Sequence, residues 1–148
     1  MSTIANPNFE QDVRDSFNRQ NAMELIRATM PVIQHGVAEV HLPHWSGIEQ
    51  QHGYAHGGVV GMIADSAAGY AAMTVIPAGA SVLSVEYKLN FMAPGVGEML
   101  IARGEVVRPG KTLIVSRAEV FSINNGQKKL CALMQQTLMV VHDKAEKQ

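Results

Sequence analysis

HGGVVGMIADSAAGYAAMTV, residues 56 to 75, is the stretch that decides the fold of this chain. The run is too long for a strand and is rich in Ala, Met and Gly, so it predicts one buried helix, which Pro77 and Gly79 end. Its many small residues cost helix propensity or packing volume unless other backbone approaches closely. We therefore expect the rest of the chain to wrap tightly around this helix.

The same stretch raises a transmembrane alternative. Residues 55 to 78 are apolar, and Gly57 and Gly61 have the small-xxx-small spacing of membrane helix pairs. Asp65 lies in the middle of the stretch, where a charge would be expensive in hydrocarbon. We therefore predict a buried helix of a globular protein, with no membrane partner.

Strand patterns follow the helix. Residues 83 to 91 alternate apolar and polar side chains, the period-two signature of a half-buried strand, and Pro94-Gly95 ends it. Three more strands are predicted over residues 99–108, 112–123 and 128–141, with hairpin turns at Pro109-Gly110 and Asn124-Asn125-Gly126. We expect these four strands to form an antiparallel meander.

The chain before the helix is less regular. Residues 8 to 30 predict a helix that Asn8 caps and Pro31 breaks, residues 32 to 42 predict a strand, and residues 43 to 53 predict a loop. We expect a single domain overall, divided into an N-terminal helical segment, 1–31, and a main body, 32–148. An antiparallel sheet around one helix covers both apolar surfaces, so the fold class is α+β.

Composition and charge narrow the class of protein. The chain has 148 residues, 47% of them hydrophobic, which suits one globular domain. A formal net charge of -1 gives no drive toward nucleic acid, so the partner is a small molecule or another copy of the chain. Cys131, the single cysteine, excludes an intrachain disulfide and is interpreted as a buried core thiol. Residues 1–10 lack the features of a secretory signal, so we expect a cytoplasmic protein.

The most informative segment runs from Gln50 to Gly58. Gln50 is followed by Gly53, which lies three residues before His56-Gly57-Gly58, and Asp65 comes nine residues after that histidine. This pattern resembles the hotdog-fold acyl-CoA thioesterases of the phenylacetate-pathway (PaaI-like) type. The resemblance extends through the strand 84–94 and the hairpin 110–112, and it covers roughly residues 32–141. It implies a hotdog fold, in which an antiparallel β-sheet wraps around one long central helix.

The resemblance is matched by the chemistry of Gly57 and Asp65. Gly57 is expected at the helix N-terminus, where N–H groups lack helical partners and the dipole favours negative charge, as an oxyanion hole requires. Burial of Asp65 on an apolar helix is costly without a compensating role. The resemblance implies that its carboxylate either activates water as a general base or attacks the thioester as a nucleophile. The alternative is a structural carboxylate satisfied by Ser66, Ser84 or backbone.

The resemblance implies catalytic roles for three further side chains. Gln50 would help to hold the thioester carbonyl, His56 would serve in positioning, and Ser84 would orient the attacking water. Their structural alternatives are a loop amide, a capping or core histidine, and an exposed strand serine. A second arrangement in the family uses a hydroxyl one helical turn after the acid, but Gly69 occupies that position here.

Substrate binding is assigned to Gly58, Arg108 and Lys111. The two basic residues lie near predicted hairpins, where they could meet the phosphates of coenzyme A, or could be ordinary surface charges. The histidines at positions 41, 44 and 52 suggest a metal site only weakly, because they have neither a cysteine partner nor ordered ligand spacing. We predict no metal and no cofactor.

Three functions compete. The first is hydrolysis of an acyl-CoA thioester to a free acid and coenzyme A. The second is a non-catalytic acyl-CoA-binding module, which would need an output element such as a DNA-reading helix pair. The third is a dehydratase of 3-hydroxyacyl thioesters, which would need a catalytic histidine paired with an acid. The motif favours the first.

The spacing of the two principal site residues predicts an oligomer. Gly57 and Asp65 are eight residues apart, which is about 12 Å along one helix axis. An oxyanion donor and an attacking group must both reach the same carbonyl group, so one subunit can hardly supply both. We expect a homo-oligomer, a dimer or the homotetramer that the resemblance favours, in which an antiparallel partner helix completes each shared site.

Overall fold

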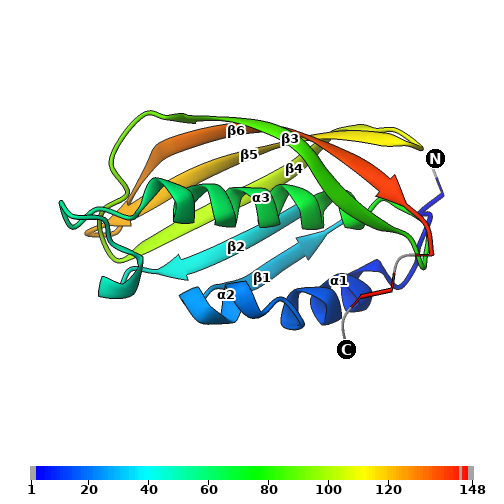
Figure 1. Ribbon diagram of the computed structural model, residues 1–148, viewed down its shortest axis with the longest axis horizontal. Helices are drawn as coiled ribbons and strands as arrows, with labels where there is room; N and C mark the ends of the chain where they lie inside the picture. Colours follow the sequence, from blue (N-terminus) through cyan, green and yellow to red (C-terminus); the bar gives the residue numbers. More distant parts are fainter. Residues whose placement is uncertain (1–2, 144, 147–148) are drawn as a thin grey trace.

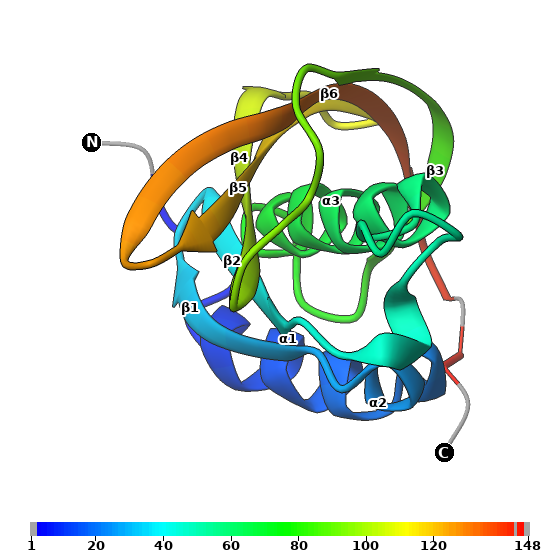
Figure 2. The same cartoon turned by 90° about the vertical axis from the view of Figure 1, so that its left-hand side faces the viewer.

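Helix α3 (Gly57–Met73) forms the centre of the molecule in the computed structural model, which describes residues 3–143 and 145–146 (Figure 1). Within these residues, six strands form one antiparallel sheet. Figure 2 shows how this sheet curves around α3. The α3 side chains facing the sheet are small and fully buried, among them Ala64, Ala67 and Ala71. The α+β hotdog arrangement and the single central helix are confirmed.

A glycine in the sheet allows the close approach that the small residues of α3 predict. Gly104 lies in β4 (Met99–Pro109), and a Cβ atom on it would lie 2.2 Å from the carbonyl oxygen of Ala67. That distance is far inside van der Waals contact, so only glycine lets the sheet backbone lie directly on the helix backbone.

The sheet order differs from the predicted meander. The remaining strands are β1 (Thr29–Gln34), β2 (Val37–Pro43), β3 (Ser81–Phe91), β5 (Leu113–Asn124) and β6 (Gln127–Val141), and the order is β1-β2-β4-β5-β6-β3. β4, β5 and β6 do form a meander. β3 instead pairs with β6, because residues 92–98 carry the chain past the start of α3, where Gly95 accepts the N–H of Ala55 at 3.0 Å.

β3 is therefore an edge strand, and its burial is not the predicted one. Leu83, Val85, Tyr87 and Phe91 are 42%, 57%, 49% and 58% exposed, although their alternation predicts a half-buried face. A register shift between Ser84 and Glu86 accompanies this exposure. The far edge of β3 has no neighbouring strand among the described residues.

The N-terminal segment also differs from the prediction of one helix over residues 8–30. It forms α1 (Phe9–Asn18) and α2 (Asn21–Ile26), which ends at Arg27 in the left-handed conformation, with φ 69°. Strand β1 follows at once and includes Pro31, which is tolerated because β1 is an edge strand. A turn at Gly36, with φ 82°, divides the strand predicted over residues 32–42 into two.

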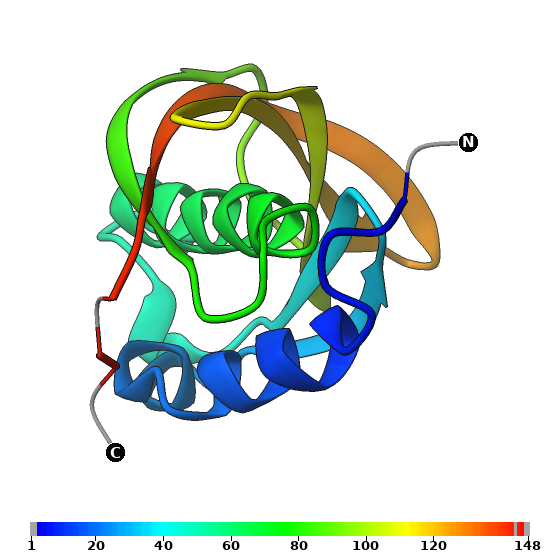
Figure 3. The same cartoon turned by 90° about the vertical axis from the view of Figure 1, so that its right-hand side faces the viewer.

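The N-terminal helices lie outside the sheet, below α3 (Figure 1). In Figure 3 the connection from α3 to β3 descends toward them, and residues 145–146 lie beside them. An ion pair of 2.6 Å joins Arg19 to Glu146.

The predicted loop 43–53 contains a short 3-10 helix, η1 (Ser46–Ile48). The division into segments 1–31 and 32–148 stays a prediction, and β1 (Thr29–Gln34) runs across its boundary.

Two further expectations concern Cys131 and the membrane. Cys131 is 1% exposed, and burial raises the pKa of its thiol, which confirms a core position. No helix in the described part of the chain combines the length and apolarity needed to cross a membrane.

Candidate active site

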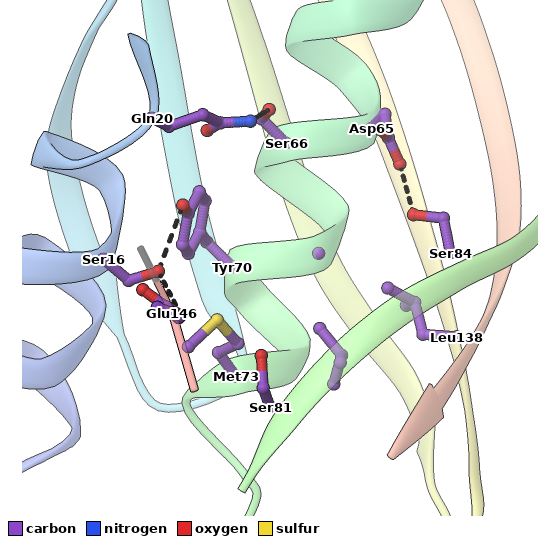
Figure 4. A pocket seen from close by; sticks show the side chains of 12 residues that line it. Ser16, Gln20, Asp65, Ser66, Tyr70, Met73, Ser81, Ser84, Leu138 and Glu146 are labelled. Atoms are coloured by element: carbon purple, nitrogen blue, oxygen red, sulfur yellow. Dashed lines mark hydrogen bonds between the residues drawn. The ribbon is translucent and has the colours of Figure 1, made fainter. Parts of the chain in front are cut away.

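Asp65 belongs to a hydrogen-bonded triangle of three side chains. It is half-buried on α3, and its Oδ1 accepts a hydrogen bond of 2.7 Å from Ser84 Oγ on β3, drawn in Figure 4. The same Oδ1 accepts from Nε2 of Gln136 on β6, and this nitrogen also donates to Ser84 Oγ at 2.9 Å. Ser84 thus accepts from Gln136 and directs its own proton to Asp65. Asp65 Oδ2 has no hydrogen-bond partner among the described residues.

Gln136 is the member of this triangle that the sequence analysis did not identify. Its side chain is 1% exposed, and it occupies an inward-facing position of β6 between Met134 and Leu138, both buried. A polar residue at a core position of an apolar strand is the signal that could have found it. Its Oε1 is buried and unpartnered within the described residues.

The start of α3 presents one free backbone donor. His56 is the N-cap residue, its Nδ1 accepting the Gly58 N–H at 2.8 Å, and its carbonyl oxygen accepts the N–H groups of Val59 and Val60. The Gly57 N–H is left without a hydrogen-bond partner in the described part of the chain. His56 therefore acts as a cap, and the N–H of Gly58, a predicted substrate contact, is already occupied.

Gln50 lines the same cavity as this free donor. Its Oε1 accepts the backbone N–H of His52 and, at 3.4 Å, that of Tyr54, so the loop fixes the amide. Its Nε2 makes no hydrogen bond within residues 3–143 and 145–146 and is free to donate. Gln50 and Gly57 line one cavity of 420 Å³, and a Cβ on Gly57 would lie 3.1 Å from Phe91 Cζ. Any side chain at position 57 would crowd this cavity.

The two halves of the predicted site are separate within one chain. Asp65 and Ser84 line a second cavity, of 170 Å³, which shares no lining residue with the cavity of Gln50 and Gly57. The structure thus brings Asp65 to Ser84 and Gln50 to Gly57, but it does not bring the acid to the free backbone donor.

The basic candidates lie elsewhere. Arg108 and Lys111 are exposed at the hairpin between β4 and β5, and Lys111 lines a hollow with residues 75–77, which follow the C-terminal end of α3. One chain therefore does not bring them to Gly57. Among the described residues, no group of three side chains is arranged to hold a metal ion, and His41 and His44 instead contact Glu39 and Glu49.

Comparison with known sequences points to one family. The family described as the thioesterase superfamily matches residues 52–129, more than half of the chain. A Saccharolobus solfataricus protein that carries a provisional esterase name is 33% identical over 87 residues. That alignment covers 59% of this chain and only 61% of the relative's length.

Solved structures agree with the sequence comparison. A thioesterase family protein from Silicibacter pomeroyi has a TM-score of 0.89 and 40% identity, over 90% of this chain and 98% of that one. The Escherichia coli PaaI protein of the phenylacetic acid degradation operon shares the fold, with a TM-score of 0.81 and 21% identity over 93% and 96% of the two chains. A Bacillus halodurans protein solved with CoA shares it at 0.73 and 21%, over 90% and 89%. With its fold, its motif and these relatives, the chain belongs to the thioesterase superfamily.

Proposed function

We propose that this protein hydrolyses acyl-CoA thioesters to a free acid and coenzyme A in sites that two subunits share. The observation that carries the proposal is the placement of Asp65 with Ser84 in one cavity and of Gly57 with Gln50 in another. Membership in the thioesterase superfamily supports the reaction, and the CoA bound by the Bacillus halodurans relative supports the substrate class.

The free edge of β3 provides the route to a shared site. An eleven-residue edge strand with exposed apolar side chains, Val85 and Phe91 among them, is a template for pairing with another copy. Antiparallel pairing of two β3 strands would place the two α3 helices alongside each other in opposite directions. Asp65 of the partner subunit would then face Gly57 of this one, and each two-fold dimer would hold two equivalent sites.

Each of the polar groups at the shared site then has a role in hydrolysis of the thioester. The carbonyl oxygen of the thioester accepts hydrogen bonds from the Gly57 N–H and from Gln50 Nε2, which stabilise the negative charge that develops there. Water gives a proton to Oδ2 of Asp65, which the partner subunit supplies, and attacks the carbonyl carbon. The C–S bond breaks, and the proton passes from Asp65 to the departing thiolate of coenzyme A. Ser84, which has a remaining lone pair, accepts from the attacking water and orients it.

Direct attack by Asp65 on the carbonyl carbon is the second route that fits this geometry. It would form an anhydride between Asp65 and the acyl group, which water then hydrolyses. A single turnover in ¹⁸O-labelled water distinguishes the routes by mass spectrometry of the enzyme. Label in the Asp65 carboxylate supports the nucleophile, because water then attacked the aspartyl carbon of the anhydride. Label in the released acid alone supports the general base only if hydroxylamine also traps no acyl anhydride on Asp65, since water attack on the acyl carbon of an anhydride labels the released acid too.

Coenzyme A would enter from the side of the Gln50 cavity. The residues lining that cavity include no Asp or Glu, so it does not repel the phosphates of coenzyme A. In an antiparallel pair, the partner's hairpin with Arg108 and Lys111 extends toward the end of the dimer where this Gly57 lies. We propose these two residues as phosphate contacts.

Complementation between inactive variants tests the shared site. Asp65→Asn should lower turnover at least about a hundredfold, and Gly57→Pro, which removes the free donor, should cost about 3 kcal/mol in the transition state. Thiol release from a panel of acyl-CoAs measures both. After subunit exchange in equal amounts, half of the dimers are mixed and each holds one intact site, so about a quarter of wild-type activity should return.

The control is exchange of Asp65→Asn subunits with subunits that carry both substitutions, which should restore nothing. Absence of recovery despite subunit exchange proven by mass would show that each site belongs to one chain. A wild-type protein that releases no thiol from any acyl-CoA would contradict the proposed reaction itself.

A further inference from the structure

Ser116 is a buried polar residue that the proposed reaction does not use. It lies on β5 at an inward-facing position and is fully buried. The other inward positions nearest to it on this strand are apolar, with Ile114 on one side and Ala118 on the other. The Ser116 Oγ has no hydrogen-bond partner among the described residues. A buried hydroxyl without a partner is costly, so its presence in the core needs a physical reason.

The register of the sheet places Ser116 directly opposite Gln136 on β6. Both side chains are buried on the inner face, and residues opposite each other in antiparallel strands have Cβ atoms about 4.5–5.5 Å apart. Gln136 also has an unpaired atom, since its Oε1 is buried and lacks a partner in the described part of the chain. The serine hydroxyl can donate, and the amide oxygen can only accept. The two unpaired atoms are therefore complementary.

The polar neighbours of Gln136 on β3 do not supply this donor. Tyr87 is opposite Gln136 on that strand, but its hydroxyl lies 3.5 Å from the position that a Cβ on Gly61 would take. Ser84 already donates its proton to the carboxylate of Asp65, as Figure 4 shows. Of the two residues directly opposite Gln136, the one on β5 is left to donate to the amide oxygen.

A donor at the oxygen end of the Gln136 amide would fix the orientation of the whole group. The Nε2 of Gln136 donates to Asp65 and Ser84, and these contacts hold only the nitrogen end. The last torsion angle of a glutamine side chain is broad, so contacts at one end leave the other end free to swing. A second hydrogen bond at Oε1 narrows that range. It also strengthens the N–H donors, because hydrogen bonds in a chain polarise one another.

We propose that Ser116 is a positioning residue that donates a hydrogen bond to Gln136 Oε1 and, through this amide, holds Asp65 for its reaction. The inference rests on the proposed thioesterase function and adds a residue from a further strand to its site. Rotation about the one torsion angle of the serine side chain moves Oγ among three staggered positions and brings it to the amide. Ser116 lines neither the Asp65 cavity nor the Gln50 cavity, so it acts without touching the substrate.

The test measures thiol release from an acyl-CoA that the wild type hydrolyses. Ser116→Ala removes the donor, so kcat should fall about three- to tenfold while KM changes less than about twofold. Ser116→Thr and Ser116→Val have the same shape and differ in the hydroxyl, so kcat of the threonine variant should be about three- to tenfold higher. Ser122→Ala is the matched control and should keep the wild-type kcat, because Ser122 is buried on the same face of β5 but pairs with Lys129.

Coupling to Gln136 is the readout that a merely structural role would not move. Leucine at position 136 has no oxygen for Ser116 to hold. Ser116→Ala added to Gln136→Leu should therefore lower kcat less than about 1.5-fold further.

The outcomes separate this inference from the proposed function. Wild-type kcat in Ser116→Ala, equal kcat in the threonine and valine variants, or an undiminished loss in the Gln136→Leu background would each overturn the positioning role while leaving the thioesterase standing. A wild-type protein that hydrolyses no acyl-CoA would instead refute the proposed function, and the positioning role with it.

Discussion

Gln136→Leu should separate activity from stability in this protein. The side chain of Gln136 donates to both Asp65 and Ser84, and leucine is similar in size but donates nothing. Without these donors the carboxylate can rotate, and the Ser84 hydroxyl is no longer directed toward it. We therefore expect the variant to lose turnover while it folds normally.

The magnitudes follow from the contacts. A hydrogen bond to a charged group contributes about 1.5–3 kcal/mol and a neutral one about 0.5–1.5 kcal/mol, and misplacement of a catalytic group by about 1 Å can cost a hundredfold. We expect kcat to fall about ten- to a hundredfold. The free energy of unfolding should change by less than about 1 kcal/mol, because leucine removes a buried amide whose Oε1 is already unpartnered among the described residues.

Thiol release under steady-state conditions measures kcat, and urea denaturation measures the free energy of unfolding. Gln135→Leu is the matched control, because Gln135 directly precedes Gln136 in β6 and its side chain is exposed on the opposite face. Adding Gln136→Leu to Asp65→Asn should lower the residual rate less than about threefold, since the residues act as a unit. Wild-type kcat in Gln136→Leu, or full additivity in the double variant, would refute the positioning role.

Three further predictions concern stability. Gly104→Ala should lower the free energy of unfolding by about 1–3 kcal/mol in urea titration, because its Cβ would meet the backbone of Ala67; an unchanged midpoint would contradict the close packing. Burial raises the pKa of Cys131, so the folded thiol keeps a proton that the unfolded chain releases near pH 8.5. The stability that the buried thiol contributes is present below that pH and is lost as pH rises through the raised folded pKa. Cys131→Ala should therefore flatten the decline in unfolding free energy above about pH 8, and an identical slope would count against it. His56→Ala should cost about 1 kcal/mol through loss of the N-cap, with recovery in His56→Asn, whose side chain can also cap; equal losses in both would argue against capping.

The sequence predicts the central helix and the strands after it with good boundaries because each has a strong local signal. The small residues of α3 and the period-two strands depend mainly on what the nearest neighbours bury. Pro109-Gly110 and Asn124-Asn125-Gly126 then place the two hairpins correctly. The start of the chain carries a weaker signal, and the strand around Pro31 was missed because its pairing partner, β2, lies beyond the turn at Gly36.

The residues of the candidate site also differ in whether a local sequence signal can predict them. Asp65, Gly57 and Gln50 belong to a contiguous motif, so the sequence can indicate them together. Gln136 reaches the Asp65 side of the site from β6, and no local pattern reports that it lies near the acid. Only the strand order, in which β6 pairs with β3, brings Gln136 to Ser84.

The apolar side chains of β3 show how an alternating pattern can predict burial that a single chain does not provide. Its apolar side chains at positions 83, 85, 87 and 91 predict a buried face, yet they are exposed in the single chain. An evolved strand that alternates so regularly, and whose edge is open, presents the surface expected of an element that is covered in an assembly. The same edge runs beside the separated halves of the site, with Ser84 near one end and Phe91 at the other. The partner that would cover β3 would also complete the catalytic groups, so the mismatch between pattern and exposure and the division of the site have one physical explanation.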